Sequence, residues 1–226
     1  MTLELPPAKS KMRTLEAADQ IAHWKLEETS GTTVADAAGA SALTSTTAAN
    51  IVDGPFYGAA NNKGRAFAAT SSASGASTAG QRTALLTDSV TVLAWFKPNA
   101  FGGFDAIVSH SAAGETQATN ALLQLETAAS GEARWIWERG AGSNKTATTT
   151  GLGLVAGQLE MLALRRRPPV SGAANKCDVD LFHNGLLFQT WLNEDLPDGG
   201  GSGSWMLGDV PGGGEAFHRF DGIGAE

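Results

Sequence analysis

Two aspartates two positions apart are the closest that this sequence comes to a catalytic carboxylate pair. Asp178 and Asp180 alternate with Val179 and Leu181, so on a β-strand both carboxylates would lie on the same face. Hydrolysis of a glycosidic bond uses two carboxyl groups that are close together, one of which donates a proton. The alternation with aliphatic residues is also typical of the polar outer face of a half-buried strand. We favour this second interpretation and predict no catalytic pair at these positions.

Other residue types that carry chemistry lack the partners they would need. Cys177 is the only cysteine, and only the adjacent Lys176 would favour its thiolate, so we interpret it as a plain thiol on a strand. The histidines show no metal-ligand spacing, and no Gly-x-Ser-x-Gly motif accompanies them. The sequence therefore favours a protein that binds over one that catalyses a reaction. The four histidines are His23, His110, His183 and His218.

Tryptophans close to polar residues are the candidates for ligand binding. Trp135, Trp137 and Arg139 fall on one face of a strand, where two indoles and a guanidinium could form a platform for a sugar. Trp191, followed closely by Asn193, is a second candidate. Core packing is the alternative for these tryptophans because Trp is highly buried on average. We favour the core for Trp135 and Trp137.

Composition and charge exclude several classes of protein. The 226 residues are 42% hydrophobic, which is enough for a substantial core. A net charge of −7 argues against a nucleic-acid partner, because phosphate binding depends on clustered Lys and Arg. The basic residues 165–167 precede two prolines and are interpreted as the end of a strand. No segment approaches the ~20 apolar residues of a membrane helix.

Short apolar runs separated by Gly, Ser, Asn and Ala indicate an all-β fold. The run Val90–Phe96 is apolar on both alternating faces, which suits a central strand that is covered on both sides. Asn184-Gly185 lies between two apolar runs and predicts a tight hairpin. Residues 69–80 are mostly Ala, Ser, Thr and Gly and are predicted to form a surface loop. The other strands are expected at 21–26, 105–109, 121–127, 133–139, 159–165, 178–182, 186–191, 205–207 and 217–223.

Six motifs, in the right order, resemble those of the laminin-G-like (concanavalin-A-like) jelly-roll family. The resemblance runs from about Ile21 to the C-terminus, and each motif is weak when taken alone. It implies an all-β sandwich of two stacked antiparallel sheets over residues 21–226, with residues 1–20 as an N-terminal arm. The first motif, residues 22–36, resembles the opening strand and turn of the family. The other five motifs are Gly64–Phe67, Val90–Pro98, Gly157–Leu164, Asp180–Gly185 and Phe220–Ile223.

The resemblance also bears on metal binding and catalysis. Some members hold a Ca²⁺ through the aspartate after the first turn and through acidic residues of the last strand. Asp36 and Asp221 are the candidate ligands here, with a solvated turn as the favoured alternative for Asp36. The Glu-x-Asp-x-x-Glu pattern of the glycoside hydrolases with this fold is absent. Because the chain stops at Glu226, the last strand is shorter than usual, and we expect an unprotected sheet edge.

The family resemblance leaves more than one function open. Most members are exported, whereas residues 1–20 lack the apolar stretch of a signal peptide, and one cysteine allows no intramolecular disulfide. These features resemble the family's occurrence in bacteriophage particles. They imply a non-catalytic virion component, made in the host cytoplasm, that decorates a capsid or forms part of a tail or fibre. Its partners would be other virion proteins or copies of itself. A glycan-binding lectin-type module is the alternative, a glycoside hydrolase the third choice, and cytoplasm the alternative location; neither nucleic acid nor membrane is an expected partner.

Overall fold

The computed structural model describes residues 20–26, 28–39, 41–45, 51–53, 63–67, 72–87, 89–112, 122–138, 144–198, 203–208 and 222–225. Of the predicted arm, only Gln20 belongs to these ranges. The regular structure of the described residues is almost entirely β-strand, as the sequence predicts. The strands are β1 (Thr33–Val34), β2 (Leu43–Ser45), β3 (Ile51–Asp53), β4 (Lys63–Phe67), β5 (Ala73–Ala76), β6 (Val90–Pro98), β7 (Asp105–Ala112), β8 (Leu123–Ala128), β9 (Glu132–Glu138), β10 (Asn144–Thr148), β11 (Glu160–Arg167), β12 (Lys176–His183), β13 (Leu186–Asp195), β14 (Gly203–Leu207) and β15 (Gly222–Ala225), with helix α1 (Ala79–Leu85) and a 3-10 turn at Ala129–Gly131.

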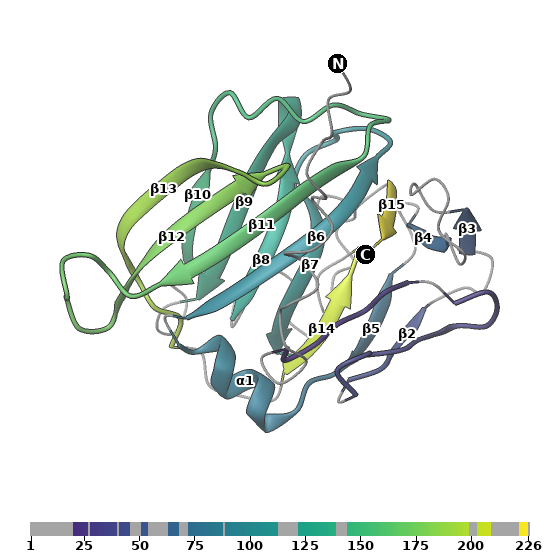
Figure 1. Cartoon of the computed structure of the whole chain (residues 1–226), viewed down its shortest axis with the longest axis horizontal. Helices are drawn as coiled ribbons and strands as arrows, with labels where there is room; N and C mark the ends of the chain where they lie inside the picture. The colour runs from purple at the N-terminus through teal and green to yellow at the C-terminus, as the bar shows by residue number, and fades with distance from the viewer. Residues whose placement is uncertain are drawn as a thin grey trace, which may run out of the picture.

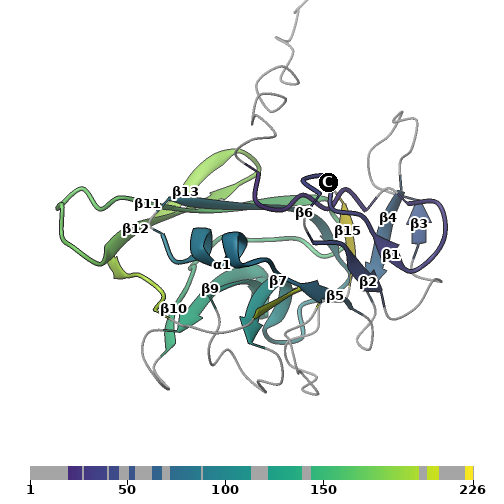
Figure 2. The same cartoon turned by 90° about the horizontal axis from the view of Figure 1, so that it is seen from below.

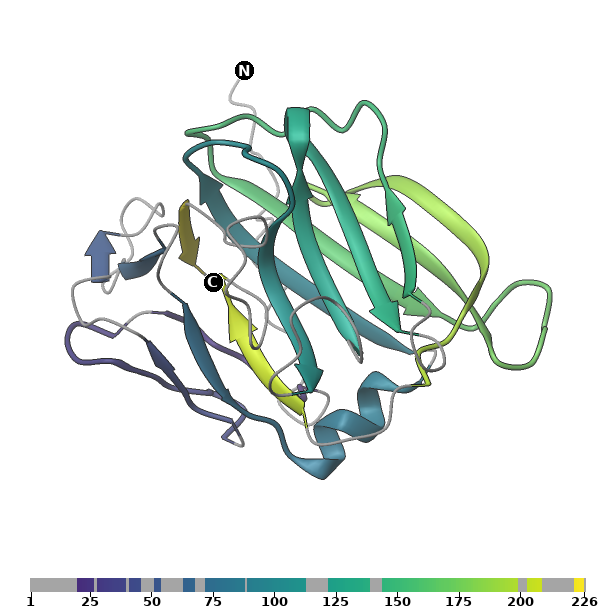
Figure 3. The same cartoon turned by 180° about the vertical axis from the view of Figure 1, so that it is seen from behind.

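The strands form two antiparallel sheets that stack as layers (Figures 1 and 2). One sheet has eight strands in the order β1-β2-β5-β14-β7-β8-β9-β10, and the other has seven in the order β13-β12-β11-β6-β15-β4-β3. Figure 3 shows β7 to β10 of the eight-stranded sheet from behind, and α1 lies between the two layers in Figure 2. This arrangement confirms the predicted jelly-roll sandwich.

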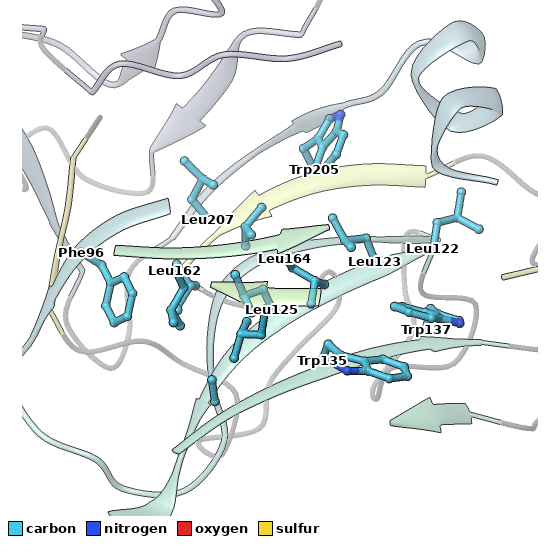
Figure 4. Packing of buried hydrophobic residues seen from close by; sticks show 14 of the residues in the cluster. Phe96, Leu122, Leu123, Leu125, Trp135, Trp137, Leu162, Leu164, Trp205 and Leu207 are labelled. Atoms are coloured by element: carbon cyan, nitrogen blue, oxygen red, sulfur yellow. The ribbon is translucent and has the colours of Figure 1, made fainter. Parts of the chain in front are cut away.

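The inner faces of the two sheets form one hydrophobic core (Figure 4). Leu123 and Leu125 of β8 meet Leu162 and Leu164 of β11, and all four are almost completely buried. Successive side chains of a strand point to opposite faces. The residues that alternate with these core positions therefore lie on the outer face of each sheet, where some of them, such as Glu126, are still buried.

The hairpin predicted at Asn184-Gly185 is confirmed. Both residues have positive φ, 49° and 84°, and the turn joins β12 to β13. Asn and Gly tolerate this backbone conformation, which matches the twist of the two strands. The hairpin thereby places β13 at one edge of the seven-stranded sheet.

Two expectations about strand surroundings are wrong. The run Val90–Phe96 does form the interior strand β6, but only its inner face is covered, and Leu93 is 40% exposed on the other side. The last strand is not at an edge either, because β15 pairs with β4 on one side and with β6 on the other. The edges of this sheet are β13 and β3.

Part of the segment 69–80 forms regular secondary structure, where the sequence predicts a surface loop. The described residues 72–80 contain β5 and the first two residues of α1. The helix starts with a capping box, in which Thr78 accepts a hydrogen bond from the Gln81 backbone N–H while the Gln81 side chain bonds back to Thr78. Such a box satisfies backbone donors that a helix start would leave unpaired. This Thr-x-x-Gln pattern is visible in the sequence.

Candidate functional site

The outer surface of β6, β11, β12 and β13 is ordered into rows by the strand register. We call this surface the β6–β13 face. Leu162, Leu164, Val179 and Leu181 belong to the core, so the residues that alternate with them lie on this face. The neighbouring rows differ in polarity. The first row is Leu93, Ala163, Phe182 and Leu187, and the second is Thr91, Arg165, Asp180 and Thr190.

The first row is an apolar strip that crosses four strands. Leu93 and Leu187 are 40% and 56% exposed at its two ends. Phe182 is partly buried between them and pairs with Ala163 of β11 in the register. Elsewhere on β13, Leu186 and Leu192 are also exposed. An exposed apolar strip next to polar groups is typical of a binding surface.

The second row is built around Asp180, which is 1% exposed. Its Oδ2 accepts hydrogen bonds from Arg165 Nε at 3.1 Å, Arg165 Nη2 at 2.7 Å and Arg167 Nε at 2.8 Å. Its Oδ1 accepts from the Thr190 hydroxyl at 2.7 Å. Burial opposes ionisation, but the hydrogen bonds from Arg167, Thr190 and Arg165 outweigh it and hold the pKa of Asp180 below its ordinary value.

Asp178 is held in a similar way one row further along. It is 1% exposed and accepts hydrogen bonds from the backbone N–H groups of Asn193 and Val170, each at 3.0 Å. Arg167 Nη1 adds a charged hydrogen bond at 2.7 Å. Burial would raise the pKa of Asp178, yet these donors lower it.

The two aspartates therefore share one face, as the sequence indicates, but both stay ionised at neutral pH. A general acid needs a raised pKa so that it holds a proton to donate. Each carboxylate is also almost completely buried and accepts hydrogen bonds from arginine and other donors. The favoured sequence interpretation placed Asp178 and Asp180 on an exposed polar face; the structure instead buries them beneath arginine side chains.

The predicted tryptophan platform lies inside the sandwich. Trp135 and Trp137 are 1% and 0% exposed, and their rings stack at 4.0 Å between centroids (Figure 4). The prediction of an exposed sugar-binding platform is wrong, because neither indole ring is exposed to solvent. The favoured alternative, that Trp135 and Trp137 belong to the core, is confirmed. Arg139 lies outside the described residues. The strand alternation simply directs the indoles inward.

The second predicted pair is divided between core and surface. Trp191 is partly buried and packs edge-to-face on Trp135 at 5.9 Å. Asn193 is exposed at φ 57°, where its side chain accepts a hydrogen bond from the Ser171 hydroxyl. Both residues belong to β13, and a ligand role for them stays a prediction.

The predicted Ca²⁺ ligand Asp36 supports a turn. Its Oδ1 accepts from the His23 backbone N–H at 2.8 Å and the Ala38 backbone N–H at 2.9 Å, while Oδ2 accepts from the Ser41 backbone N–H at 2.9 Å. N–H donors surround the carboxylate where a Ca²⁺ site would place oxygens. Among the described residues, no group of three His, Cys, Asp or Glu side chains is placed to hold a metal. Asp221 lies outside them, so Ca²⁺ binding stays a prediction.

Sequence reasoning missed the residues that make the β6–β13 face distinctive. Leu93 and Phe182 sit in runs that look like core, and Arg165 sits at the end of a strand as predicted. The alternation of Arg165 with the core residue Leu164 was the available signal. Which residues become neighbours across strands depends on register, which the sequence alone does not reveal.

Comparison with known families and structures agrees with this architecture. The family model described as the concanavalin A-like lectin/glucanases superfamily, a laminin G model, matches residues 69–223. The chain belongs to this superfamily. The match covers more than half of the chain and includes all four strands of the β6–β13 face. No curated protein matches the chain.

Three solved structures illustrate the fold of the superfamily. The carbohydrate-binding module CBM40 of the Ruminococcus gnavus IT-sialidase, bound to α2,3-sialyllactose, is 17% identical, with a TM-score of 0.52 over 72% of this chain and 81% of that one. Domain 4 of the arabinanase AbnA from Geobacillus stearothermophilus, in complex with arabinotriose, is 16% identical, with a TM-score of 0.56 over 91% and 88%. The binding domain of Paraclostridial Mosquitocidal Protein 1 is 10% identical, with a TM-score of 0.59 over 90% and 48%. At these identities the likeness concerns the fold.

In the described part of the chain, no helix is long and apolar enough to cross a membrane.

Proposed function

We propose that this protein is a non-catalytic carbohydrate-binding module whose binding surface is the β6–β13 face. The observation that carries the proposal is the pairing of an apolar row with a hydrogen-bonding row across four adjacent strands. A sugar ring has the same two-sided character, with C–H groups on its faces and hydroxyl groups around its rim. The ring face of Phe182 attracts C–H groups, while Arg165 and the Thr91 hydroxyl offer hydrogen bonds next to it.

Two further observations support a binding role without catalysis. The two carboxylates of this face, Asp178 and Asp180, have lowered pKa values and are paired with arginines. Two of the three similar structures described above hold a glycan, namely the sialidase module CBM40 with sialyllactose and domain 4 of the arabinanase with arabinotriose. Glycan binding was the alternative from the sequence and becomes the leading hypothesis here. The virion role and the virion location stay predictions that neither the geometry nor the similar structures test.

The proposal is tested by screening the protein on a glycan array and measuring affinity for the best ligand by calorimetry. The change Phe182→Ala removes the ring at the centre of the apolar row, and Leu93→Ala trims its exposed end. We expect at least about tenfold weaker binding for Phe182→Ala, since loss of a stacking contact and its buried area exceeds 1.4 kcal/mol.

Val155→Ala is the matched control, because Val155 is 44% exposed, close to the 40% of Leu93, but lies in the loop before β11. It should bind as the unchanged protein does. Melting curves for all variants separate lost binding from lost folding. If no glycan binds the unchanged protein, or if Phe182→Ala folds and binds equally well, the proposal is wrong.

A further inference from the structure

The charges that the β6–β13 face shows to solvent differ in sign from the protein as a whole. The chain carries a net charge of −7. On this face, however, Asp178 and Asp180 are 1% exposed, whereas the side chains of Arg165 and Arg167 are 44% and 29% exposed. The carboxylates lie beneath the guanidinium groups that they bind. A ligand on this face therefore meets positive charge first.

Arg165 is fixed in a geometry that leaves one edge of its guanidinium open. Asp180 Oδ2 occupies the edge formed by Nε and Nη2. The Phe182 ring lies 5.0 Å from the guanidinium carbon. Among the described residues, Nη1 of Arg165 has no hydrogen-bond partner. The edge formed by Nη1 and Nη2 thus keeps two parallel N–H donors available, on a side chain that is 44% exposed.

A fixed guanidinium edge recognises a particular shape. Two parallel N–H groups match the two oxygens of a planar carboxylate, and such bidentate pairs are stronger than hydrogen bonds between neutral groups. Because Asp180 and Phe182 already hold Arg165 in place, little side-chain freedom is lost on binding. The apolar row lies directly beside Arg165, at a position where the ring bearing that carboxylate would rest.

Arg134 on the other sheet provides a comparison. Its Nε and Nη2 also bind one carboxylate oxygen, Glu126 Oε2, and its guanidinium stacks on Phe104 at 3.3 Å. That side chain is only 13% exposed and its partner Glu126 is completely buried. Arg134 is therefore held by a carboxylate and a phenyl ring in the same way as Arg165, but its side chain is much less exposed to solvent. Of the two arginines, Arg165 is the one that a ligand can reach.

We propose that the glycan bound by the β6–β13 face carries a carboxylate, as a sialic or uronic acid does, and that this carboxylate binds the Nη1–Nη2 edge of Arg165. The inference rests on the proposed function and narrows it from glycans in general to acidic glycans. A polyanion such as nucleic acid fits less well, since phosphate binding depends on many clustered cations and this face shows two arginines, both already paired with carboxylates.

The test compares glycan pairs that differ in the acidic group, namely sialyllactose against lactose and trigalacturonic acid against galactotriose. By calorimetry, at least one acidic member should bind about tenfold more tightly than its neutral counterpart, the range expected of a charged bidentate pair. Its affinity should fall as salt rises from roughly 50 to roughly 500 mM, because salt screens exposed charges.

Two variants test the role of Arg165. Arg165→Gln removes the positive charge and the paired N–H donors of the guanidinium, and should abolish the preference for the acidic member over its neutral counterpart. Thr91→Asp places a carboxylate opposite Arg165 in the register without altering the bonds to Asp180. The new carboxylate should compete with the ligand for the Nη1–Nη2 edge of Arg165 and so abolish the preference for acidic glycans. Arg134→Gln is the control and should retain that preference.

The outcomes separate the two proposals. Equal affinity for acidic and neutral glycans would overturn the acidic-glycan inference and leave the carbohydrate-binding function standing. A preference that survives in folded Arg165→Gln and Thr91→Asp would also overturn it. Failure to bind any glycan would refute the proposed function itself.

Discussion

Trp135 and Trp137 form a matched pair for testing what holds the core together. Both indoles are at most 1% exposed, and they stack on each other at 4.0 Å. Trp135 also packs edge-to-face on Trp191 at 5.9 Å, and the Arg166 guanidinium carbon lies 5.2 Å from the Trp137 ring. The difference in hydrogen bonding is at Nε1. Trp137 Nε1 donates a hydrogen bond to the Asp195 backbone carbonyl at 2.8 Å, whereas Trp135 Nε1 has no acceptor among the described residues. Replacing either indole by phenyl therefore removes similar volume but different polar interactions.

The expected difference between Trp135→Phe and Trp137→Phe follows from that atom. Both variants lose packing, and this loss is smaller than the ~3–5 kcal/mol of truncating a buried Trp to Ala. Trp137→Phe also leaves the buried Asp195 carbonyl one hydrogen bond short, which costs about 1–3 kcal/mol. Trp135→Phe removes a buried donor that has no partner and so recovers part of its packing loss. Trp137→Phe should therefore be the less stable variant by about 1–3 kcal/mol, or roughly 2–12 °C in melting temperature.

Equilibrium urea unfolding measures this difference. The comparison holds if the two variants and the unchanged protein have equal m-values, because the surface exposed on unfolding is then the same. Trp135→Ala and Trp137→Ala serve as upper limits for the packing loss. Equal stability of the two Phe variants, or a lower stability of Trp135→Phe, would refute the reasoning.

Three further changes test the face and the turns. Asp180→Asn should lower the free energy of unfolding by about 1–3 kcal/mol, since charged hydrogen bonds to two partly exposed arginines are weakened; an unchanged urea midpoint would contradict this. The pKa values of Asp178 and Asp180 are lower in the folded than in the unfolded protein, so ionisation of these groups stabilises the fold at pH values above their unfolded pKa values of about 4. This stabilisation is lost as the pH falls through their folded pKa values. The urea midpoint should therefore decrease below about pH 4, and the decrease should be less steep in Asp180→Asn. Asp36→Ala should lower the melting temperature to the same extent with Ca²⁺ as with a chelator, because its partners are backbone N–H groups; a loss seen only with Ca²⁺ would show that Asp36 is a metal ligand.

The sequence by itself determined the fold class and much of the strand pattern. Short apolar runs separated by small residues predict an antiparallel sandwich, because a two-residue side-chain period requires one buried face per strand. Asn184-Gly185 specified its hairpin, since this pair tolerates positive φ at both positions. Family motifs in order added the jelly-roll topology. These are local properties, and they depend on residues that are neighbours in the chain.

The binding face was decided only by the tertiary structure. The run Val90–Phe96 is apolar on both faces, so its sequence cannot tell which face packs inward and which carries the exposed Leu93. Asp180, Arg165 and Thr190 lie on three different strands and become a network only when those strands pair in one register. The same pairing buries the aspartates under the arginines and lowers their pKa values. Register and sheet order arise from long-range packing of the core, so no local pattern could have placed Leu93, Phe182 and Arg165 side by side.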